Sequence, residues 1–195
     1  MARHSVLGTR RPAGIEGALA RRIRLLALDV DGVLTDNAIY LGPVNGCRVE
    51  LKRFDIQDGL GIRLLQDTGI EVVWISARES EATRLRAAEL QVATVIQDSG
   101  GRKLPALARL IEERGLDWTE VAFVGDDLAD LSVMERVGLP MAVANATEEV
   151  LAAACFTTTL AGGHGAVREA IEALLKARGE WTAVVARYRA ARDGI

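Results

Sequence analysis

A short apolar segment that ends at two aspartates constrains this chain more than any other feature. Residues 23–28 are mostly apolar, which is typical of a buried strand in a parallel sheet. Asp29 and Asp31 follow directly, and Gly32 comes next. Because neighbouring carboxylates repel each other, this pair requires a cation or a shared proton close by. Open α/β sheets bind their ligands at the carboxyl ends of the strands, where this pair would lie.

The two aspartates suggest a division of chemical work. We interpret Asp29 as a nucleophile, Asp31 as a general acid/base, and Mg²⁺ as the cation that makes the pair tolerable. A solvated turn is the alternative interpretation, because Asp and Gly are common turn residues. The other strand ends decide between the two interpretations.

Composition limits the classes of protein that need to be considered. A chain of 195 residues with 49% hydrophobic and 26% charged residues suits one globular domain. The net charge of −3 gives no indication of nucleic acid or an anionic membrane as a partner. Cys47 and Cys155 belong to no C-x-x-C motif, which is typical of a reducing compartment. Without a bilayer-spanning run or a signal-peptide pattern, a cytoplasmic protein is expected.

Strand and helix patterns alternate along the chain, which predicts an α/β fold with a parallel sheet. A second strand is expected at 70–75 and ends at Ser76, whose hydroxyl could donate to a phosphate oxygen. A strand at 118–124 meets Asp126, Asp127 and Asp130, of which Asp126 is the expected metal ligand and Asp130 is expected to cap a helix or steady its neighbours. A third strand is expected at 91–96.

Lys103 lies at the start of a helix expected at 104–114. A cation is unfavourable there because of the helix dipole, unless an anion lies beside it. This position therefore suggests a lysine that binds phosphate. A helix at 80–90 is expected to bury Ala82, Leu85 and Leu90.

A β-hairpin is expected at about 38–54, because Asn45-Gly46 is a strong signal for a two-residue turn. We interpret this hairpin as a flap over the carboxylate pair. Asp58 is then expected to cap a helix that runs to about residue 68, with Gly59 in its first turn. The ends of the chain are expected to be a flexible tail at 1–22, with a short helix at 18–22, and a terminal helix within 179–195.

In this order, the strand ends resemble those of the haloacid dehalogenase-type phosphohydrolases. The segment D-V-D-G-V-L-T-D is similar to their first motif, Ser76 to their second, Lys103 to their third, and G-D-D-L-A-D to their fourth. Within that group the chain resembles the 3-deoxy-D-manno-octulosonate 8-phosphate (Kdo 8-phosphate) phosphatases from residue 24 to about 175. This closer resemblance rests on F-D-I-Q-D-G-L-G-I-R, I-S-A-R and G-G-x-G-A-V-R-E.

The resemblance implies a three-layer, Rossmann-like parallel sheet in residues 23–178, with a small β-hairpin in place of a cap domain. It also implies a homotetramer, Mg²⁺ as cofactor, and hydrolysis of Kdo 8-phosphate through an aspartyl-phosphate. Asp29, Asp31, Ser76 and Lys103 would be catalytic, and Asp29, Asp126 and the backbone carbonyl of Asp31 would hold the metal. The residues that would contact the substrate are Asp55, Ile56, Gln57, Asp58, Gly59, Arg63, Arg78, Arg86 and Asp127.

Three departures from the family pattern concern the leaving group rather than the hydrolytic centre. His164 replaces a usual arginine, Ala77 replaces a usual glycine, and the loop at 98–102 is longer than usual. Kdn 9-phosphate or another sugar phosphate therefore stays open as a substrate. A non-catalytic regulatory relative is disfavoured because both Asp29 and Asp31 are present. A receiver-type signalling domain is disfavoured because the middle strand ends in Ser76 rather than in an aspartate.

Overall fold

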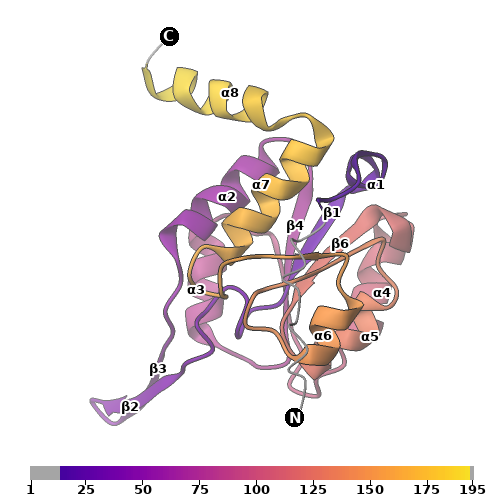
Figure 1. Cartoon of the computed structure of the whole chain (residues 1–195). Coiled ribbons are helices and arrows are strands. Elements are labelled where there is room, and N and C mark those ends of the chain that lie inside the picture. Colours follow the sequence, from indigo (N-terminus) through magenta and orange to yellow (C-terminus); the bar gives the residue numbers. More distant parts are fainter. Residues whose placement is uncertain (1–13, 194–195) are drawn as a thin grey trace, which may run out of the picture.

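The computed structural model describes residues 14–193. Its main sheet has six parallel strands in the order β5-β4-β1-β6-β7-β8 (Figure 1). The α/β fold with a parallel sheet, predicted from the sequence, is thus confirmed. The strands are β1 (Leu25–Leu28), β4 (Glu71–Ser76), β5 (Thr94–Gln97), β6 (Val121–Gly125), β7 (Leu139–Ala142) and β8 (Phe156–Thr157).

Helices cover both faces of this sheet, which gives the three layers. One face is packed against α1 (Gly17–Arg22), α2 (Ile56–Gln66), α3 (Glu81–Glu89), α7 (Ala166–Arg178) and α8 (Trp181–Asp193). The other face is packed against α4 (Lys103–Glu113), α5 (Leu131–Met134) and α6 (Glu148–Ala153). Two 3-10 turns, η1 (Trp118–Glu120) and η2 (Leu128–Asp130), flank β6.

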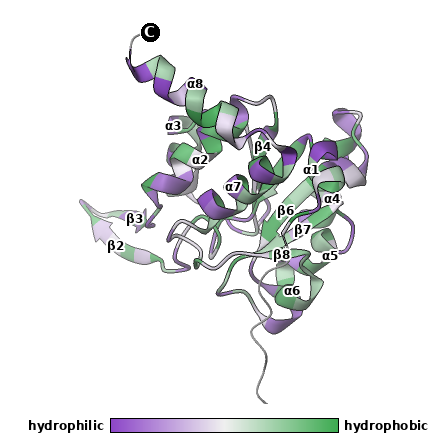
Figure 2. Ribbon diagram, turned by 45° about the horizontal axis from the view of Figure 1, so that its top comes forward, coloured by the Kyte–Doolittle hydropathy of each residue, from purple (hydrophilic) through white to green (hydrophobic). Residues whose placement is uncertain are grey.

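The middle strand β1 is buried on both faces, which explains its unbroken apolar sequence. Leu26 and Leu28 belong to the core on one side of the sheet, whereas Leu25 and Ala27 belong to the core on the other side. All four side chains are fully buried. Figure 2 shows the apolar residues concentrated in the strands of the sheet and on the helix faces that cover it.

The predicted hairpin is present and projects from the body of the molecule (Figure 1). It consists of β2 (Tyr40–Val44) and β3 (Cys47–Leu51), joined at Asn45 and Gly46, whose φ angles of 51° and 79° are those that the turn requires. Its base is anchored to the body. Phe54 bridges to Thr35, and the Phe54 ring stacks on Trp74 with centroids 6.2 Å apart. The hairpin therefore has a fixed base and a free tip.

Asp58 caps a different helix from the one predicted. The N-cap of α2 is Asp55, whose carboxylate accepts the N–H of Gln57 at 2.7 Å. Asp58 lies inside the first turn, is buried, and accepts the N–H of Arg168 at the start of α7 at 2.7 Å. The prediction that Asp58 caps its own helix is therefore wrong. Asp55 and Asp58 both lie near the start of α2. The packing of α7 against α2 engages Asp58 and leaves Asp55 as the N-cap of α2.

The ends of several elements also differ from the sequence prediction. The N-terminal helix α1 is packed, with Ala20 in the core, so the predicted tail is shorter than 1–22, and residues 1–13 lie outside the described part. Leu85 is 64% exposed, because α3 instead buries Thr83 and Ala87. The strand expected at 118–124 begins at Val121, because η1 precedes it.

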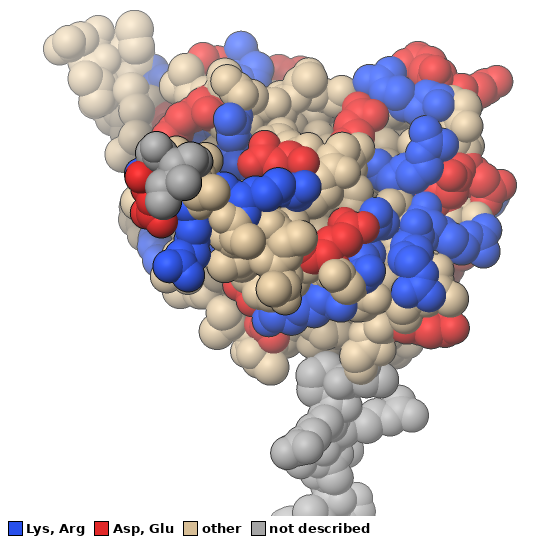
Figure 3. Space-filling view, turned by 90° about the horizontal axis from the view of Figure 1, so that it is seen from above, with Lys and Arg blue, Asp and Glu red and all other residues tan. Residues whose placement is uncertain are grey.

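The expected terminal helix is present as α8 and packs on the body through Val184. Within residues 14–193, no helix combines the length and apolar content needed to cross a membrane. Figure 3 shows basic and acidic side chains interspersed over one face of the molecule.

Burial makes Asp58 a source of pH-dependent stability. Burial raises its pKa from 3.8 to about 6, although the backbone N–H groups of α7 oppose this shift. The folded chain therefore holds this proton more tightly than the unfolded chain does. The stability that the group contributes is complete below pH 3.8 and is lost as the pH rises through about 6.

We expect Asp58→Asn, which removes this titration, to become more stable relative to the unmodified chain as the pH rises. The gain in the free energy of unfolding is expected to be about 2 kcal/mol between roughly pH 4.5 and pH 7. Urea denaturation of both proteins at the two pH values measures it. An equal difference between the two proteins at both pH values would show that Asp58 does not titrate in this range.

Candidate active site

Three neighbouring strands and the start of α4 bring the predicted catalytic residues to one pocket. Strand β1 lies between β4 and β6, so the residues after these strands meet at one edge of the sheet, where the strand order reverses. The pocket has a volume of about 150 Å³. Its wall is formed by Asp29, Asp31, Asn37, Ser76, Ala77, Arg78, Lys103, Asp126, Asp127, Ala129 and Asp130.

Lys103 is the cation at the centre of this arrangement. It is the first residue of α4 and is only 4% exposed, and its ammonium contacts Asp29 and, at 2.7 Å, Asp130. Burial opposes its charge, but these two carboxylates prevail and raise the pKa of Lys103 to about 12. The sequence predicts an anion beside Lys103 at the start of α4, and the carboxylates of Asp29 and Asp130 provide part of that negative charge.

One ammonium group does not balance the carboxylates around it. Burial and the charge of Asp130 raise the pKa of Asp29 well above its usual range, and Lys103 opposes them only in part. The same two causes raise the pKa of Asp126 to about 7. Oxygen atoms of Asp29, Asp126 and Asp130 lie within 4.8 Å of one another, and Oδ1 of Asp126 is buried without a hydrogen-bond partner. This donor set fits a hard divalent cation such as Mg²⁺.

Asp130 holds the loop in place rather than offering free oxygens. Its Oδ1 accepts from Lys103, and its Oδ2 accepts the N–H of Asp126 at 2.9 Å and of Asp127 at 3.3 Å. This bears out the expectation that Asp130 steadies its neighbours. Asp29 and the unpartnered oxygen of Asp126 are therefore the side chains best placed for a metal.

The glycine of the D-x-D-G segment is required by the approach of Asp126. Gly32 has a φ of 101°, and a Cβ atom there would lie 2.0 Å from Oδ2 of Asp126. Behind it, Asn145 donates to the Gly32 carbonyl at 3.3 Å and accepts the Gly162 N–H at 2.7 Å. Sequence reasoning missed Asn145, because nothing in its surroundings marks it as a support for a distant loop.

Asp31 and Ser76 occupy the side of the pocket nearest the hairpin. The Ser76 hydroxyl lies 3.5 Å from Oδ2 of Asp31, and Lys52 donates to Oδ1 of Asp31 at 2.6 Å. Arg78 lies at the rim and forms an ion pair with Glu50 of the hairpin at 3.4 Å. Lys52 thus occupies one of the two carboxylate oxygens of Asp31. The metal role that the resemblance implies for Asp31 concerns its backbone carbonyl and not this side chain.

The structure brings together only some of the predicted substrate contacts. Arg78 and Asp127 line the pocket. Arg86 lies outside that wall and joins the start of α2, where its guanidinium donates to the carbonyl of Asp55 at 3.3 Å and packs over Gly59. Ile56, which is 82% exposed, and Gln57 belong to the same turn, and Asp58 is engaged by α7 as described above.

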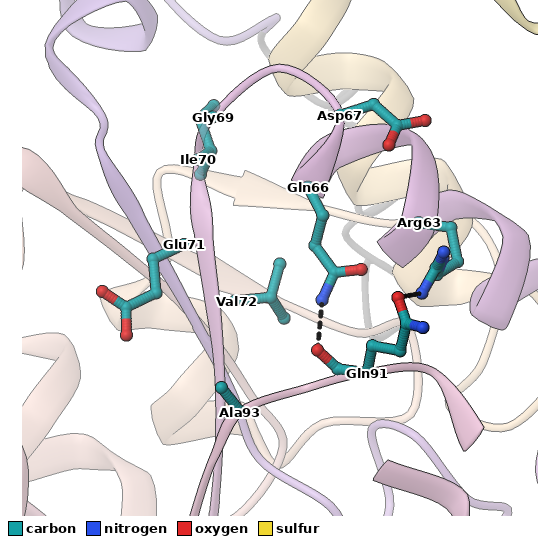
Figure 4. A pocket seen from close by; sticks show the side chains of 9 residues that line it. All are labelled: Arg63, Gln66, Asp67, Gly69, Ile70, Glu71, Val72, Gln91 and Ala93. Atoms are coloured by element: carbon teal, nitrogen blue, oxygen red, sulfur yellow. Dashed lines mark hydrogen bonds between the residues drawn. The ribbon is translucent and has the colours of Figure 1, made fainter. Parts of the chain in front are cut away.

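Arg63 lies apart from the other predicted substrate contacts. Its guanidinium bonds Gln91 and, at 3.4 Å, the Leu90 carbonyl, and it lines a separate hollow of about 380 Å³ (Figure 4). Glu71, at the opposite end of β4 from Ser76, lines the same hollow. Arg63 comes seven residues after Ile56, roughly 10 Å along the helix. The prediction that Arg63 reaches the substrate therefore finds no support in the geometry of one chain.

Comparison with known proteins agrees with this geometry. Residues 88–171 match the family model of the haloacid dehalogenase-like hydrolases. The chain is 45% identical to the 3-deoxy-D-manno-octulosonate 8-phosphate phosphatase of Escherichia coli K12 over 84% of its own length and 85% of that protein. It is 40% identical to the enzyme of the same name from Yersinia pestis, over 82% and 83% of the two chains.

Solved structures give the same result. A crystal structure of 3-deoxy-D-manno-octulosonate 8-phosphate phosphatase from Moraxella catarrhalis, in complex with magnesium, phosphate and Kdo, superposes with a TM-score of 0.82 at 38% identity and covers 88% of this chain and 97% of its own. A cobalt-bound form from Haemophilus influenzae gives 0.76 at 33% identity, with 84% and 94% covered. The chain therefore belongs to the haloacid dehalogenase-like hydrolases, in the family of the 3-deoxy-D-manno-octulosonate 8-phosphate phosphatases.

Proposed function

We propose that the chain is a Mg²⁺-dependent phosphatase that hydrolyses Kdo 8-phosphate to Kdo and phosphate. The observation that carries the proposal is the pocket in which buried Asp29 lies beside Lys103 and Asp126, with Asp31 in the same wall. The names of the relatives and the magnesium, phosphate and Kdo in the Moraxella neighbour support the choice of substrate and metal. A non-catalytic relative would not need this complete set of groups.

The first chemical step transfers the phosphoryl group to the protein. The carboxylate of Asp29 attacks phosphorus, the bond between phosphorus and the sugar oxygen breaks, and Asp31 gives its proton to the departing oxygen. Ser76 and Lys103 bind the phosphoryl oxygens and stabilise the negative charge on them during the transfer. Asp29, Asp126 and the backbone carbonyl of Asp31 would hold Mg²⁺, which would supply positive charge against the phosphoryl group.

The second step returns Asp29 to its starting state. Water attacks the phosphorus of the aspartyl-phosphate, and Asp31, now a carboxylate, accepts a proton from that water. The bond between phosphorus and the Asp29 oxygen then breaks, which releases inorganic phosphate and leaves Asp31 protonated for the next turnover. One carboxyl group thus serves as acid and then as base.

Recognition of the sugar acid is assigned to cations and polar groups around the pocket. Arg78 at the rim provides positive charge for an anionic substrate, and Arg86, which lies outside the pocket wall beside Asp55, is a second cation. His164 is held within the chain, because its ring nitrogens lie 2.9 Å from the Gly162 carbonyl oxygen and 3.2 Å from Arg53. His164 and Ala77 both depart from the family pattern in the region that concerns the leaving group. Kdn 9-phosphate is therefore the second candidate substrate.

We further propose that the chain works as a homotetramer in the cytoplasm. The hairpin exposes several large apolar side chains, namely Tyr40, Leu41, Val44 and Leu51, with Ile56 close by in sequence. Such a surface is typical of a contact with another chain. The two cysteines, which are free and exposed, suit a reducing compartment.

Light scattering is expected to give a mass four times that of the 21.0 kDa chain. Leu41→Glu is expected to lower this mass, because burying a carboxylate in an apolar contact is costly. A monomeric mass for the unmodified protein at micromolar concentration would contradict the tetramer.

Asp29→Asn is expected to reduce phosphate release by at least about 10³-fold, because an amide is not a competent nucleophile. The fold should survive, since Lys103 keeps Asp130 as its partner. A colorimetric phosphate assay and a thermal melt measure the two effects. Asp67→Asn, an exposed change at the end of α2, is the matched control and should retain activity. Full activity of Asp29→Asn would exclude the nucleophile assignment.

A panel of phosphorylated sugars tests the substrate. We expect kcat/KM for Kdo 8-phosphate to exceed that for common hexose phosphates by a factor on the order of 10², because only a matched leaving group satisfies the polar groups of the site. Removing divalent ions with EDTA should abolish turnover, and added Mg²⁺ should restore it. A higher kcat/KM for Kdn 9-phosphate would transfer the assignment to the second candidate.

A further inference from the structure

A fully buried ammonium group lies directly behind Asp31. Lys52 follows the last residue of β3, and its side chain has no solvent exposure. Its Nζ lies 2.6 Å from Oδ1 of Asp31, 3.5 Å from Oγ1 of Thr83 and 3.7 Å from Oε1 of Glu50. The ammonium donates hydrogen bonds to Asp31 and Thr83, and Glu50 adds an ion pair. Because an unpaired buried charge is very costly, the position of the group is closely fixed.

Lys52 reaches the pocket only through Asp31. It is absent from the wall of the pocket, whereas Asp31 is part of that wall. Lys52 holds one carboxylate oxygen of Asp31, and the other lies 3.5 Å from Ser76 Oγ. Rotation of a free aspartate carboxyl group is only weakly restricted. The bond from Lys52 therefore selects which oxygen faces the substrate.

The base of the hairpin keeps Lys52 itself in place. Two residues after Lys52, Phe54 bridges to Thr35 and stacks on the buried Trp74. Two residues before it, Glu50 pairs with Arg78 at 3.4 Å. The chain is thus fixed to the body on both sides of Lys52, although the tip of the hairpin projects freely.

We propose that Lys52 is a positioning residue for the acid/base step, an inference that rests on the proposed phosphatase function. It binds Oδ1 of Asp31 so that Oδ2 points at the oxygen of the leaving group and can deliver its proton. The hairpin then does more than cover the pocket, because its base sets the geometry of proton transfer. A lysine that only stabilised the hairpin would affect all substrates alike.

The dependence of rate on the leaving group separates these two roles. The ratio kcat/KM includes only the steps up to departure of the leaving group, so the common second step does not contribute. Nitrophenolate leaves without needing a proton, whereas phenolate needs one. We expect Lys52→Met to lower kcat/KM about 30-fold for phenyl phosphate and less than about 3-fold for p-nitrophenyl phosphate. If the unmodified protein does not hydrolyse aryl phosphates, two other substrates replace them. Kdo 8-phosphate has a leaving group that needs a proton, whereas its sulfur-bridged analogue releases a thiolate that needs none.

Arg53→Met provides the matched control, because Arg53 is the next cation of the hairpin base and bonds Gly163 and His164 instead of Asp31. It should change kcat/KM by the same factor for both leaving groups. When Asp31→Asn is already present, adding Lys52→Met should lower kcat/KM by less than about 2-fold, because the effect of Lys52 passes through Asp31. If a urea titration shows that Lys52→Met is not folded, Lys52→Gln replaces it. Its loss of kcat/KM should again be larger for phenyl phosphate than for p-nitrophenyl phosphate, by a smaller factor.

Two outcomes overturn the proposal in different ways. An equal loss for both leaving groups in Lys52→Met, or a full additional loss in the Asp31→Asn background, would leave Lys52 with a purely structural role. Absence of phosphate release from every substrate by the unmodified protein would instead remove the proposed function, and this inference with it.

Discussion

The crowding of carboxylates around one buried ammonium is the interaction on which the rest of the structure depends. Asp29, Asp126 and Asp130 come from two loops that would repel each other without Lys103. Lys103 offsets only part of that repulsion, which is why burial and Asp130 still raise the pKa of Asp29 and of Asp126. An electrostatic imbalance of this kind suits a protein that binds a divalent cation and a phosphoryl group together, because each compensates the charge of the other.

The loops that carry these groups are packed backbone against backbone. Gly32 leaves room for the Asp126 carboxylate, and a Cβ atom at Gly162 would lie 1.7 Å from the Gly32 carbonyl. Asn145 bonds both glycines, so the Gly-rich turn after β8 supports the loop after β1. The start of α7 is in turn held by Asp58. The glycine-rich segment that carries part of the family resemblance thus serves here as support for the site.

The hairpin connects the chemistry to the surface. Its base supplies Lys52 to Asp31 and Glu50 to Arg78, while its two strands present apolar side chains outward. Contacts along the strands and the geometry of the acid/base are therefore parts of one element. A contact on the hairpin can therefore affect proton transfer in the pocket through the bond between Lys52 and Asp31.

The sequence by itself determined the fold class, the hairpin, the strand ends that carry Asp29, Asp31, Ser76 and Asp126, and the helix start at Lys103. Buried strands and the polar residues that follow them are encoded in contiguous residues. Only the tertiary structure decided which distant groups these residues meet. It assigned Asp58 to α7, separated Arg63 from the pocket, and placed Asn145 and Lys52 behind the reactive loops. Such pairings depend on how helices pack across the sheet, and no local pattern records the partner that a side chain finds more than twenty residues away.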